Sequence, residues 1–218
     1  MPILRRSKVI FIHIPKTGGS SVGSAVGMYD SQSNSSMSEH MVLPESAEGG
    51  APNRVPEGHY TSQHFTAAMI RAEVPNYDRC YKFTFVRDPY TRMLSAYYYR
   101  TGNGLKEYTD FDPGTFHEWV SHLLGGPEDV FRYPQASFVD DTVDFVGRFE
   151  NLETDLRKVL DRLFRIRGMC GVLRSGMPHV RSSGLPKGPL VGMMLLKTRR
   201  MIEKFYGDDF SEFGYEKQ

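Results

Sequence analysis

Short apolar runs alternate along this chain with segments in which apolar residues recur every three or four positions. Residues 9–14 (Val-Ile-Phe-Ile-His-Ile) are almost continuously apolar and rich in β-branched residues, which predicts a buried strand. Residues 80–86 (Cys-Tyr-Lys-Phe-Thr-Phe-Val) place aromatic side chains at every second position and predict another strand. A third strand is expected over residues 143–149.

Helical periodicity fills the intervals between these strands. It is clearest over residues 152–166, where one face holds Leu152, Leu156, Val159, Leu160 and Leu163. Further helices are expected over residues 21–28, 67–73, 89–100, 115–124 and 190–205. Strands that alternate with helices predict an α/β fold, with a central parallel sheet flanked by helices in a single domain over residues 1–218. Residues 29–57 are rich in Ser, Gly, Pro and Asn and are expected to form a long loop or flap.

A turn with distinctive chemistry follows the first predicted strand. Residues 15–21 read Pro-Lys-Thr-Gly-Gly-Ser-Ser and lead into a predicted helix. Backbone N–H groups at a helix start lack partners within the helix, and the helix dipole favours negative charge there. Such a turn can hold a phosphate-like anion, and Lys16 adds a mobile positive charge. It is not a Walker A loop, because the lysine precedes the glycines; the alternative is a plain connection with an exposed lysine.

The second predicted strand also ends at a cation. Arg87 follows this strand, and Asp88-Pro89 supplies an N-cap and a proline for the first position of the next helix. Ligands of open α/β sheets gather at the carboxyl ends of strands, so Lys16 and Arg87 are expected to bind two anionic groups of one ligand. Alternatively, Arg87 forms an ion pair and Ser95 is only a small packing residue. Arg92 is expected at the surface or in an ion pair.

Composition narrows the class of protein. The 218 residues suffice for one α/β domain with a full core, and the net charge of +1 argues against a general nucleic-acid binder. Cys80 and Cys170 lack metal-ligand spacing and are expected to be free thiols, so no metal site is predicted. No apolar run approaches the ~20 residues that cross a bilayer, and no signal peptide is recognisable. A cytoplasmic location is therefore expected.

The two anion-binding segments together resemble the sulfotransferases that use 3′-phosphoadenosine 5′-phosphosulfate (PAPS), and specifically the carbohydrate type. That group contains the heparan 2-O- and chondroitin sulfotransferases and their bacterial relatives. Residues 14–21 are similar to the 5′-phosphosulfate loop of the family, and residues 85–97 to its 3′-phosphate segment. Residues 143–152 and 205–215 also resemble family segments, so the resemblance covers essentially the whole chain. It implies a sulfotransferase fold of the P-loop NTPase-like kind.

The resemblance also implies a role for individual residues. Lys16 would contact the 5′-phosphosulfate near its bridging oxygen and neutralise charge on the departing phosphate. The 5′-phosphate would be wrapped by backbone and hydroxyl donors of Thr17, Gly18, Gly19, Ser20 and Ser21. The 3′-phosphate would be bound by Arg87 and Ser95. A guanidinium suits phosphate oxygens well, because it can donate two parallel hydrogen bonds.

An acceptor hydroxyl must lose a proton as it attacks sulfur, and histidine is the usual base near neutral pH. Residues 58–67 resemble the family segment that supplies this base, and they contain His59 and His64. His64 is preferred, because His64-Phe65-Thr66-Ala67 fits the family pattern His-x-Thr/Ser-Ala ahead of a helix. His59 remains the alternative. His13 lies within the first predicted strand and is expected to be structural.

The sequence thus predicts a PAPS-dependent sulfotransferase that acts without a metal on an acceptor hydroxyl, which the resemblance places on a carbohydrate. Two other classes stay open. A kinase or other phosphoryl-transfer enzyme is disfavoured by the lack of a Walker A loop and of an acidic magnesium motif. A non-catalytic nucleotide-binding module is disfavoured by Lys16 and the candidate histidines. The oligomeric state is not predicted.

Overall fold

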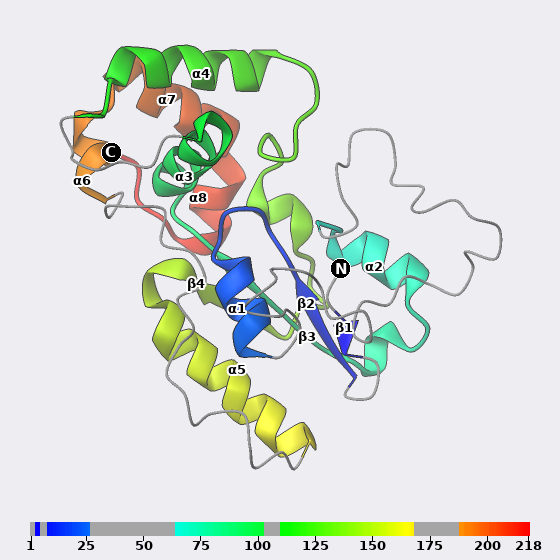
Figure 1. Cartoon of the computed structure of the whole chain (residues 1–218). Helices are drawn as coiled ribbons and strands as arrows, with labels where there is room; N and C mark the ends of the chain where they lie inside the picture. The colour runs from blue at the N-terminus through cyan, green and yellow to red at the C-terminus, as the bar shows by residue number, and fades with distance from the viewer. Residues whose placement is uncertain (1–2, 5–7, 27–63, 103–109, 168–187) are drawn as a thin grey trace. The chain divides into compact units, whose positions relative to one another are not determined.

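The computed structural model describes residues 3–4, 8–26, 64–102, 110–167 and 188–218 (Figure 1). The predicted loop or flap over residues 29–57 and the candidate base His59 lie outside the described residues. The chain divides into two compact units, one formed by Met1–Val86 and Ser137–Arg181 and the other by Arg87–Ala136 and Ser182–Gln218. Each unit has a hydrophobic core of its own. The expectation of a single domain stays a prediction.

A four-stranded sheet forms the centre of the first unit. Its strands are β1 (Ile3–Leu4), β2 (Val9–Ile12), β3 (Tyr81–Val86) and β4 (Phe145–Arg148), and they lie side by side in this order. β2, β3 and β4 run parallel, as predicted. β1 is not among the predicted strands, and it pairs antiparallel with β2 at the edge of the sheet. The reason is the short connection after β1, since a parallel neighbour needs a crossover of about a dozen residues or more.

Two helices cover one face of this sheet. α1 (Gly19–Ala25) and α5 (Leu152–Arg167) share a core with β2 and β3 that contains Phe11, Phe83 and Phe85 (Figure 1). The leucines predicted to face inward from α5 line this core. α1 begins two residues earlier than predicted, because Gly18 adopts a left-handed conformation and serves as its N-cap. The first unit also contains α2 (Ala67–Glu73), η2 (Tyr77–Arg79) and η5 (Phe149–Asn151).

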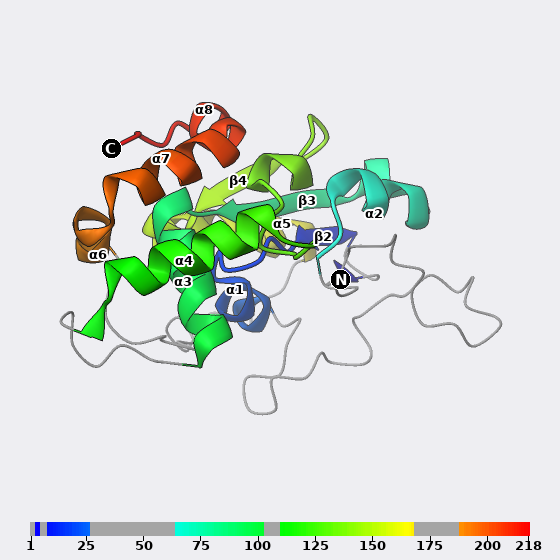
Figure 2. The same ribbon diagram turned by 90° about the horizontal axis from the view of Figure 1, so that it is seen from above.

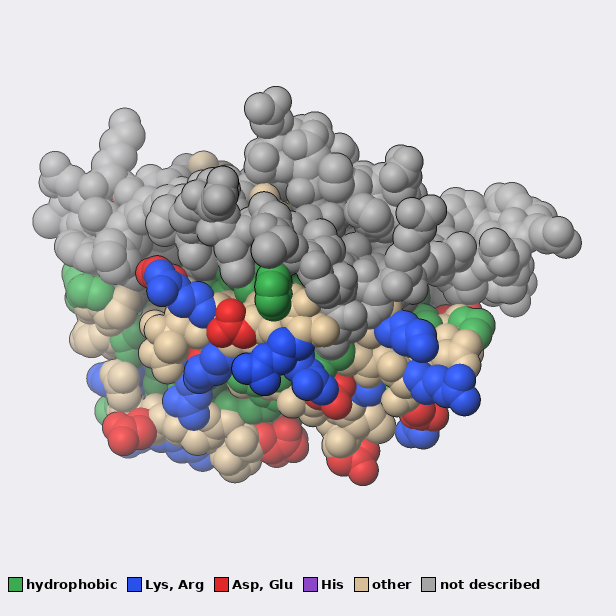
Figure 3. Space-filling view, turned by 90° about the horizontal axis from the view of Figure 1, so that it is seen from below, with side chains coloured by type: hydrophobic (Ala, Val, Ile, Leu, Met, Phe, Trp, Pro, Cys, Tyr) green, Lys and Arg blue, Asp and Glu red, His purple; other side chains and the backbone are tan. Residues whose placement is uncertain are grey.

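The outer side of α5 is charged. Figure 3 shows the molecule from the side on which α5 lies in Figure 1, and Lys and Arg side chains are prominent there among acidic ones. Exposed cations of this helix are Arg157, Lys158, Arg162 and Arg165. Two of them pair within the helix, Arg157 with Glu153 at 2.6 Å and Lys158 with Asp155 at 2.7 Å. Pairs at this spacing stabilise a helix by only a few tenths of a kcal/mol, roughly 0.2–0.5.

The second unit is helical. It contains α3 (Pro89–Thr101), α4 (Pro113–Gly125), α6 (Gly188–Met193), α7 (Leu196–Phe205) and α8 (Gly207–Phe213). α3 packs against α4, α6 and α7, and Figure 2 shows α4 beside α7. Their shared core includes Tyr90, Phe116, Ile202 and Tyr206. The turn η4 (Gln135–Phe138) contains the point at which the chain passes from the second unit back to the first.

The helix predicted over residues 190–205 is in fact two helices. Leu195 has an extended backbone (φ −61°, ψ 139°) and separates α6 from α7. The apolar run that suggested one helix does not form one buried face, since Leu190 and Val191 are buried while Leu195 and Leu196 are exposed. The prediction of one helix was therefore wrong, because some apolar residues of this run lie in the core and others lie at the surface. α8 was not predicted.

Candidate functional site

The loop between β2 and α1 has a left-handed backbone at two positions. Lys16 has a φ of 69°, which is uncommon for any residue with a side chain, and Gly18 has a φ of 87°. A Cβ at position 18 would also lie 3.0 Å from a ring carbon of Phe149. The Thr17 hydroxyl is buried and donates a hydrogen bond to the carbonyl oxygen of Ile14 at 2.9 Å. These contacts and backbone angles restrict the conformations open to the loop.

The residues that are expected to surround an anion differ in how far their side chains are exposed to solvent. Lys16, Ser20 and Ser21 are partly exposed, whereas Thr17 and Gly19 are buried. The hydroxyl proton of Thr17 is used inside the loop, so this side chain braces the turn. Uncommon backbone conformations of this kind cost about 1–3 kcal/mol and persist at sites where the surrounding structure enforces them. The strained φ of Lys16 therefore marks this loop as a candidate binding site.

His64 lies at the base of the loop. Its Nδ1 atom is 2.9 Å from the carbonyl oxygen of His13. Because a carbonyl oxygen only accepts, Nδ1 of His64 donates this hydrogen bond. The proton of a neutral His64 is then on Nδ1, and Nε2 is the basic nitrogen. Two residues later, Thr66 caps α2, its side chain accepting from the backbone N–H of Met69 at 3.2 Å, which fixes the chain beside His64.

The imidazole of His13 is buried between His64 and the start of α1. The two imidazole rings are 4.7 Å apart, centre to centre, and the His13 ring stacks on Phe11 at 5.5 Å. On its other side, a Cβ at position 19 would overlap Nε2 of His13, so only glycine fits there. Burial, together with the nearby His64 and Lys16, holds the pKa of His13 well below its ordinary value of 6.5. His13 is therefore neutral near neutral pH.

Arg87 is held by its neighbours in the second unit. It directly follows Val86, the last residue of β3. Gln135 binds both backbone groups of Arg87, accepting from its N–H and donating to its carbonyl oxygen, each at 2.8 Å. The Nε–H of Arg87 donates to the Thr91 hydroxyl at 3.1 Å. The Asp88 carboxylate accepts from the backbone N–H of Thr91 at 2.9 Å, which confirms the predicted N-cap.

Ser95 lies on α3 one turn beyond Thr91. Residues four apart share a helix face, so Ser95 lies on the face that Thr91 and the Arg87 guanidinium occupy. Both residues are buried, and their joint binding of one phosphate stays a prediction. Lys16, His13 and His64 belong to the first unit, whereas Arg87 and Ser95 belong to the second.

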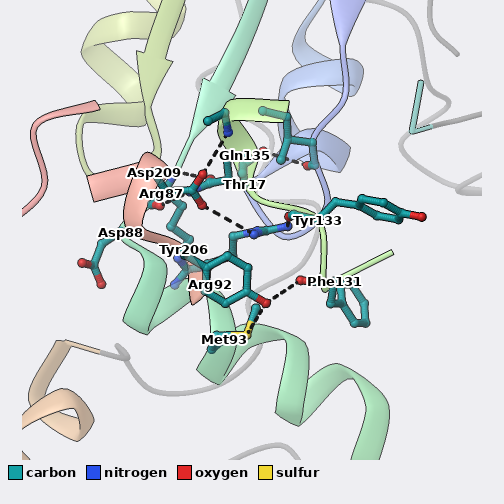
Figure 4. A network of polar contacts seen from close by, with 12 residues as sticks. Thr17, Arg87, Asp88, Arg92, Met93, Phe131, Tyr133, Gln135, Tyr206 and Asp209 are labelled. Atoms are coloured by element: carbon teal, nitrogen blue, oxygen red, sulfur yellow. Dashed lines mark hydrogen bonds and ion pairs between the residues drawn. The ribbon is translucent and has the colours of Figure 1, made fainter. Parts of the chain in front are cut away.

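Arg92 anchors a buried polar network in the second unit (Figure 4). Its guanidinium donates to the carbonyl oxygen of Tyr133 at 3.1 Å and lies 3.9 Å from the carboxylate of Asp209. Asp209 also accepts from Gln135 at 3.2 Å and from the backbone N–H of Ala136 at 2.9 Å. Burial lowers the pKa of Arg92, and Asp209 opposes this shift. Of the two predicted environments for Arg92, the ion pair is confirmed and the surface position is wrong.

Sequence reasoning missed several residues that shape these two regions. Gln135 and Asp209 form the contacts that hold the start of α3, and Phe149 covers Gly18. Gln135 stands in no segment that resembles the family, whereas Asp209 lies in residues 205–215, to which the sequence assigned no role; burial reveals the role of both. The sequence does single out His13, because a histidine interrupts an otherwise apolar predicted strand.

The chain matches the Sulfotransferase family over residues 2–216, which is nearly its whole length. The chain therefore belongs to the Sulfotransferase family and is a sulfotransferase enzyme with a mixed α/β fold. No curated protein and no solved structure matches it.

Two further findings concern the described part of the chain. None of its helices combines the length and apolar character that a membrane-spanning helix requires. Within the same residues, no three His, Cys, Asp or Glu side chains are grouped so that they could hold a metal ion.

Proposed function

We propose that this enzyme transfers the sulfuryl group of PAPS to a hydroxyl group of a carbohydrate, with His64 as the general base. The acceptor oxygen forms a bond to sulfur while the bond between sulfur and the bridging oxygen of the 5′-phosphate breaks. The acceptor proton passes to Nε2 of His64, and adenosine 3′,5′-bisphosphate leaves. Transfer of this kind needs in-line positioning, a base and charge stabilisation on the leaving oxygen.

The hydrogen bond from His64 to His13 is the observation that best supports this proposal. It fixes the proton of neutral His64 on Nδ1 and makes Nε2 the atom that can accept a proton. The bond also ties His64 to the residue three positions before Lys16. A base and a cation at one loop are what sulfuryl transfer requires, because one takes the acceptor proton and the other neutralises the leaving phosphate.

The loop would hold the 5′-phosphosulfate. Ser20 and Ser21 are partly exposed hydroxyl donors at the start of α1, and Lys16 is partly exposed at a constrained backbone position. An ammonium group acts on phosphate oxygens as a compact point charge. Glycine at positions 18 and 19 lets the backbone follow a path that side chains would block.

Arg87 and Ser95 would bind the 3′-phosphate. The hydrogen bond from Arg87 Nε–H to Thr91 orients the guanidinium plane, and Gln135 fixes the backbone behind it. A guanidinium oriented in advance loses less conformational entropy when it binds a phosphate. Ser95, on the same face of α3, would add a hydroxyl donor. The carbohydrate acceptor rests on the resemblance in the sequence.

A transfer assay tests this function. The protein is incubated with PAPS and a panel of sugars and oligosaccharides, and mass spectrometry follows both the sulfated acceptor and adenosine 3′,5′-bisphosphate. We expect transfer by the wild type, and losses of roughly 100- to 10,000-fold in kcat for His64→Ala, the size of a general-base contribution. Lys16→Ala should also lose transfer. Lys8→Ala and His122→Ala are matched controls, because both side chains are exposed and outside the site; they should keep full activity.

The assay also separates the alternatives. Equal activity of wild type and His64→Ala would contradict the assignment of the base, and loss of activity in His59→Ala alone would move it to His59. Transfer of phosphate from ATP with magnesium, in place of sulfuryl transfer from PAPS, would overturn the proposed function.

A further inference from the structure

The His13 imidazole lies between two elements of the proposed site in the first unit, the His64 ring and the start of α1. One side of the ring lies against His64, and its Nε2 edge lies against Gly19, the first residue of α1. Its stacking partner Phe11 stacks in turn on Phe83 of the neighbouring strand at 5.0 Å. The ring is 9% exposed and cannot move without displacing one of these neighbours.

We propose that His13 is a positioning residue. Its side chain holds the His64 ring against the carbonyl oxygen of residue 13 and fixes the position of that ring relative to the start of α1. This inference rests on the proposed function, because it assigns a use to the basic nitrogen of His64. His64 donates its hydrogen bond to the backbone carbonyl oxygen of residue 13, an acceptor that any amino acid at this position would provide. The side chain adds a packing surface that keeps the His64 ring hydrogen-bonded to that carbonyl oxygen.

A neutral His13 suits this role. A cation 4.7 Å from His64 would repel the imidazolium that forms when His64 takes the acceptor proton, and would weaken it as a base. Burial is the main reason that the pKa of His13 is lowered, and the charges of His64, the N-terminal amino group and Lys16 lower it further. His13 therefore supports His64 sterically without opposing its protonation.

A merely structural role would predict a different pattern of effects. If His13 only filled space, its removal would lower stability and leave the proton position on His64 unchanged. If His13 positions His64, its removal lets the His64 ring turn away from the carbonyl. Positioning errors of about 1 Å can cost roughly 100-fold in rate, so a loosened base should also reduce kcat.

Nitrogen NMR of the His64 ring tests this directly and needs no enzymatic activity. In the wild type, the neutral ring should carry its proton on Nδ1. In His13→Ala, the ring should shift toward the form protonated on Nε2. His13→Gln, which keeps most of the volume, serves if His13→Ala does not fold. Val9→Ala is the control for a lost buried side chain in β2, the strand that ends just before His13. An unchanged proton position in a folded His13 variant would overturn the proposal.

A double-mutant cycle on kcat provides the second arm. His13→Ala should lose about 10-fold or more in kcat, and His13→Ala/His64→Ala should be within about 2-fold of His64→Ala, because effects that pass through one residue do not add. Val9→Ala should keep its kcat within about 2-fold. Losses that multiply in the double variant would show that His13 acts independently of His64. Failure of the proposed function would appear separately, as a wild type that transfers no sulfuryl group.

Discussion

The buried imidazole of His13 links stability to pH in this protein. Burial is the first reason for its lowered pKa, followed by the charges of His64 and Lys16. The folded state holds His13 neutral at pH values where the unfolded chain binds a proton. A depressed pKa of this kind contributes stability that is fully present above the unfolded value of 6.5 and is lost as the pH falls below it.

We therefore expect the free energy of unfolding of the wild type to fall as the pH drops from above 6.5 toward the lower pKa of folded His13. His13→Gln has no group that titrates there and should show a flatter dependence. Urea unfolding across this range gives the measurement. Asp112 and Asp155, whose pKa values are lowered from 3.8, act only at more acidic pH. Equal slopes for the two proteins would contradict the role given to burial.

Some local features of the candidate site could be predicted from sequence and others could not. The glycine turn at Gly18 and the N-cap at Asp88 follow local rules, because a left-handed turn favours glycine and a helix start favours an N-cap residue. Gln135 acts on Arg87 across 48 positions in the sequence. A contact of that kind depends on tertiary packing, which no spacing along the chain encodes.

Helix α8 stabilises the second unit through one carboxylate. Asp209, in the first turn of α8, accepts hydrogen bonds from Gln135 and from the backbone of Ala136, and it lies beside the guanidinium of Arg92 on α3. All four groups are at least partly buried. Tyr206 adds a hydrogen bond from its hydroxyl to the carbonyl oxygen of Phe131 at 2.8 Å. α8 therefore connects α3 to the segment that carries Gln135.

Asp209→Ala should strongly destabilise the protein. Removing one partner of a buried ion pair leaves the other charge uncompensated, and the typical cost is about 3–5 kcal/mol. Asp208→Ala is a matched control, because Asp208 is the preceding residue in the same helical turn but is exposed. Chemical denaturation should show a large loss for Asp209→Ala and less than about 1 kcal/mol for Asp208→Ala. Similar losses in both variants would contradict the importance of this network.

Element boundaries were predictable wherever one local signal ended the element. The helix predicted over residues 67–73 is α2 with the same bounds, since Thr66 caps its start and Val74-Pro75 follows it. The break at Leu195 could not be predicted, because neither glycine nor proline marks it and the apolar pattern continues through it. There the packing of the second unit overrides the local preference of the sequence.

Among the described residues, each of the two units has a hydrophobic core of its own, whereas the sequence predicts one domain. Aromatic residues of β2 and β3 dominate the first core, and helix faces form the second. The boundary between the two units falls between Val86, which is the last residue of β3, and Arg87. The class of fold was predictable from the alternation of strands and helices, whereas the division into units was not, because both sides of the boundary belong to one apparent strand–turn–helix motif.

The central proposal is that Lys16 binds the 5′-phosphate of the nucleotide and Arg87 its 3′-phosphate. Adenosine 3′,5′-bisphosphate and adenosine 5′-monophosphate differ only in the 3′-phosphate, so they separate the two roles. Loss of one charge-assisted contact typically costs about 1.5–3 kcal/mol, or roughly 10- to 150-fold in affinity. Lys16→Ala should weaken both ligands, whereas Arg87→Ala should weaken only the bisphosphate. Arg87→Lys should recover part of that loss, since it keeps the charge without the paired donors.

Isothermal titration calorimetry of these ligands, with ATP and magnesium as the comparison, is the most direct measurement. We predict that the bisphosphate binds the wild type more tightly than either the monophosphate or ATP with magnesium, and that Arg87→Ala removes the advantage over the monophosphate. Tighter binding of ATP with magnesium, or an Arg87→Ala protein that still prefers the bisphosphate to the same degree, would contradict the claim.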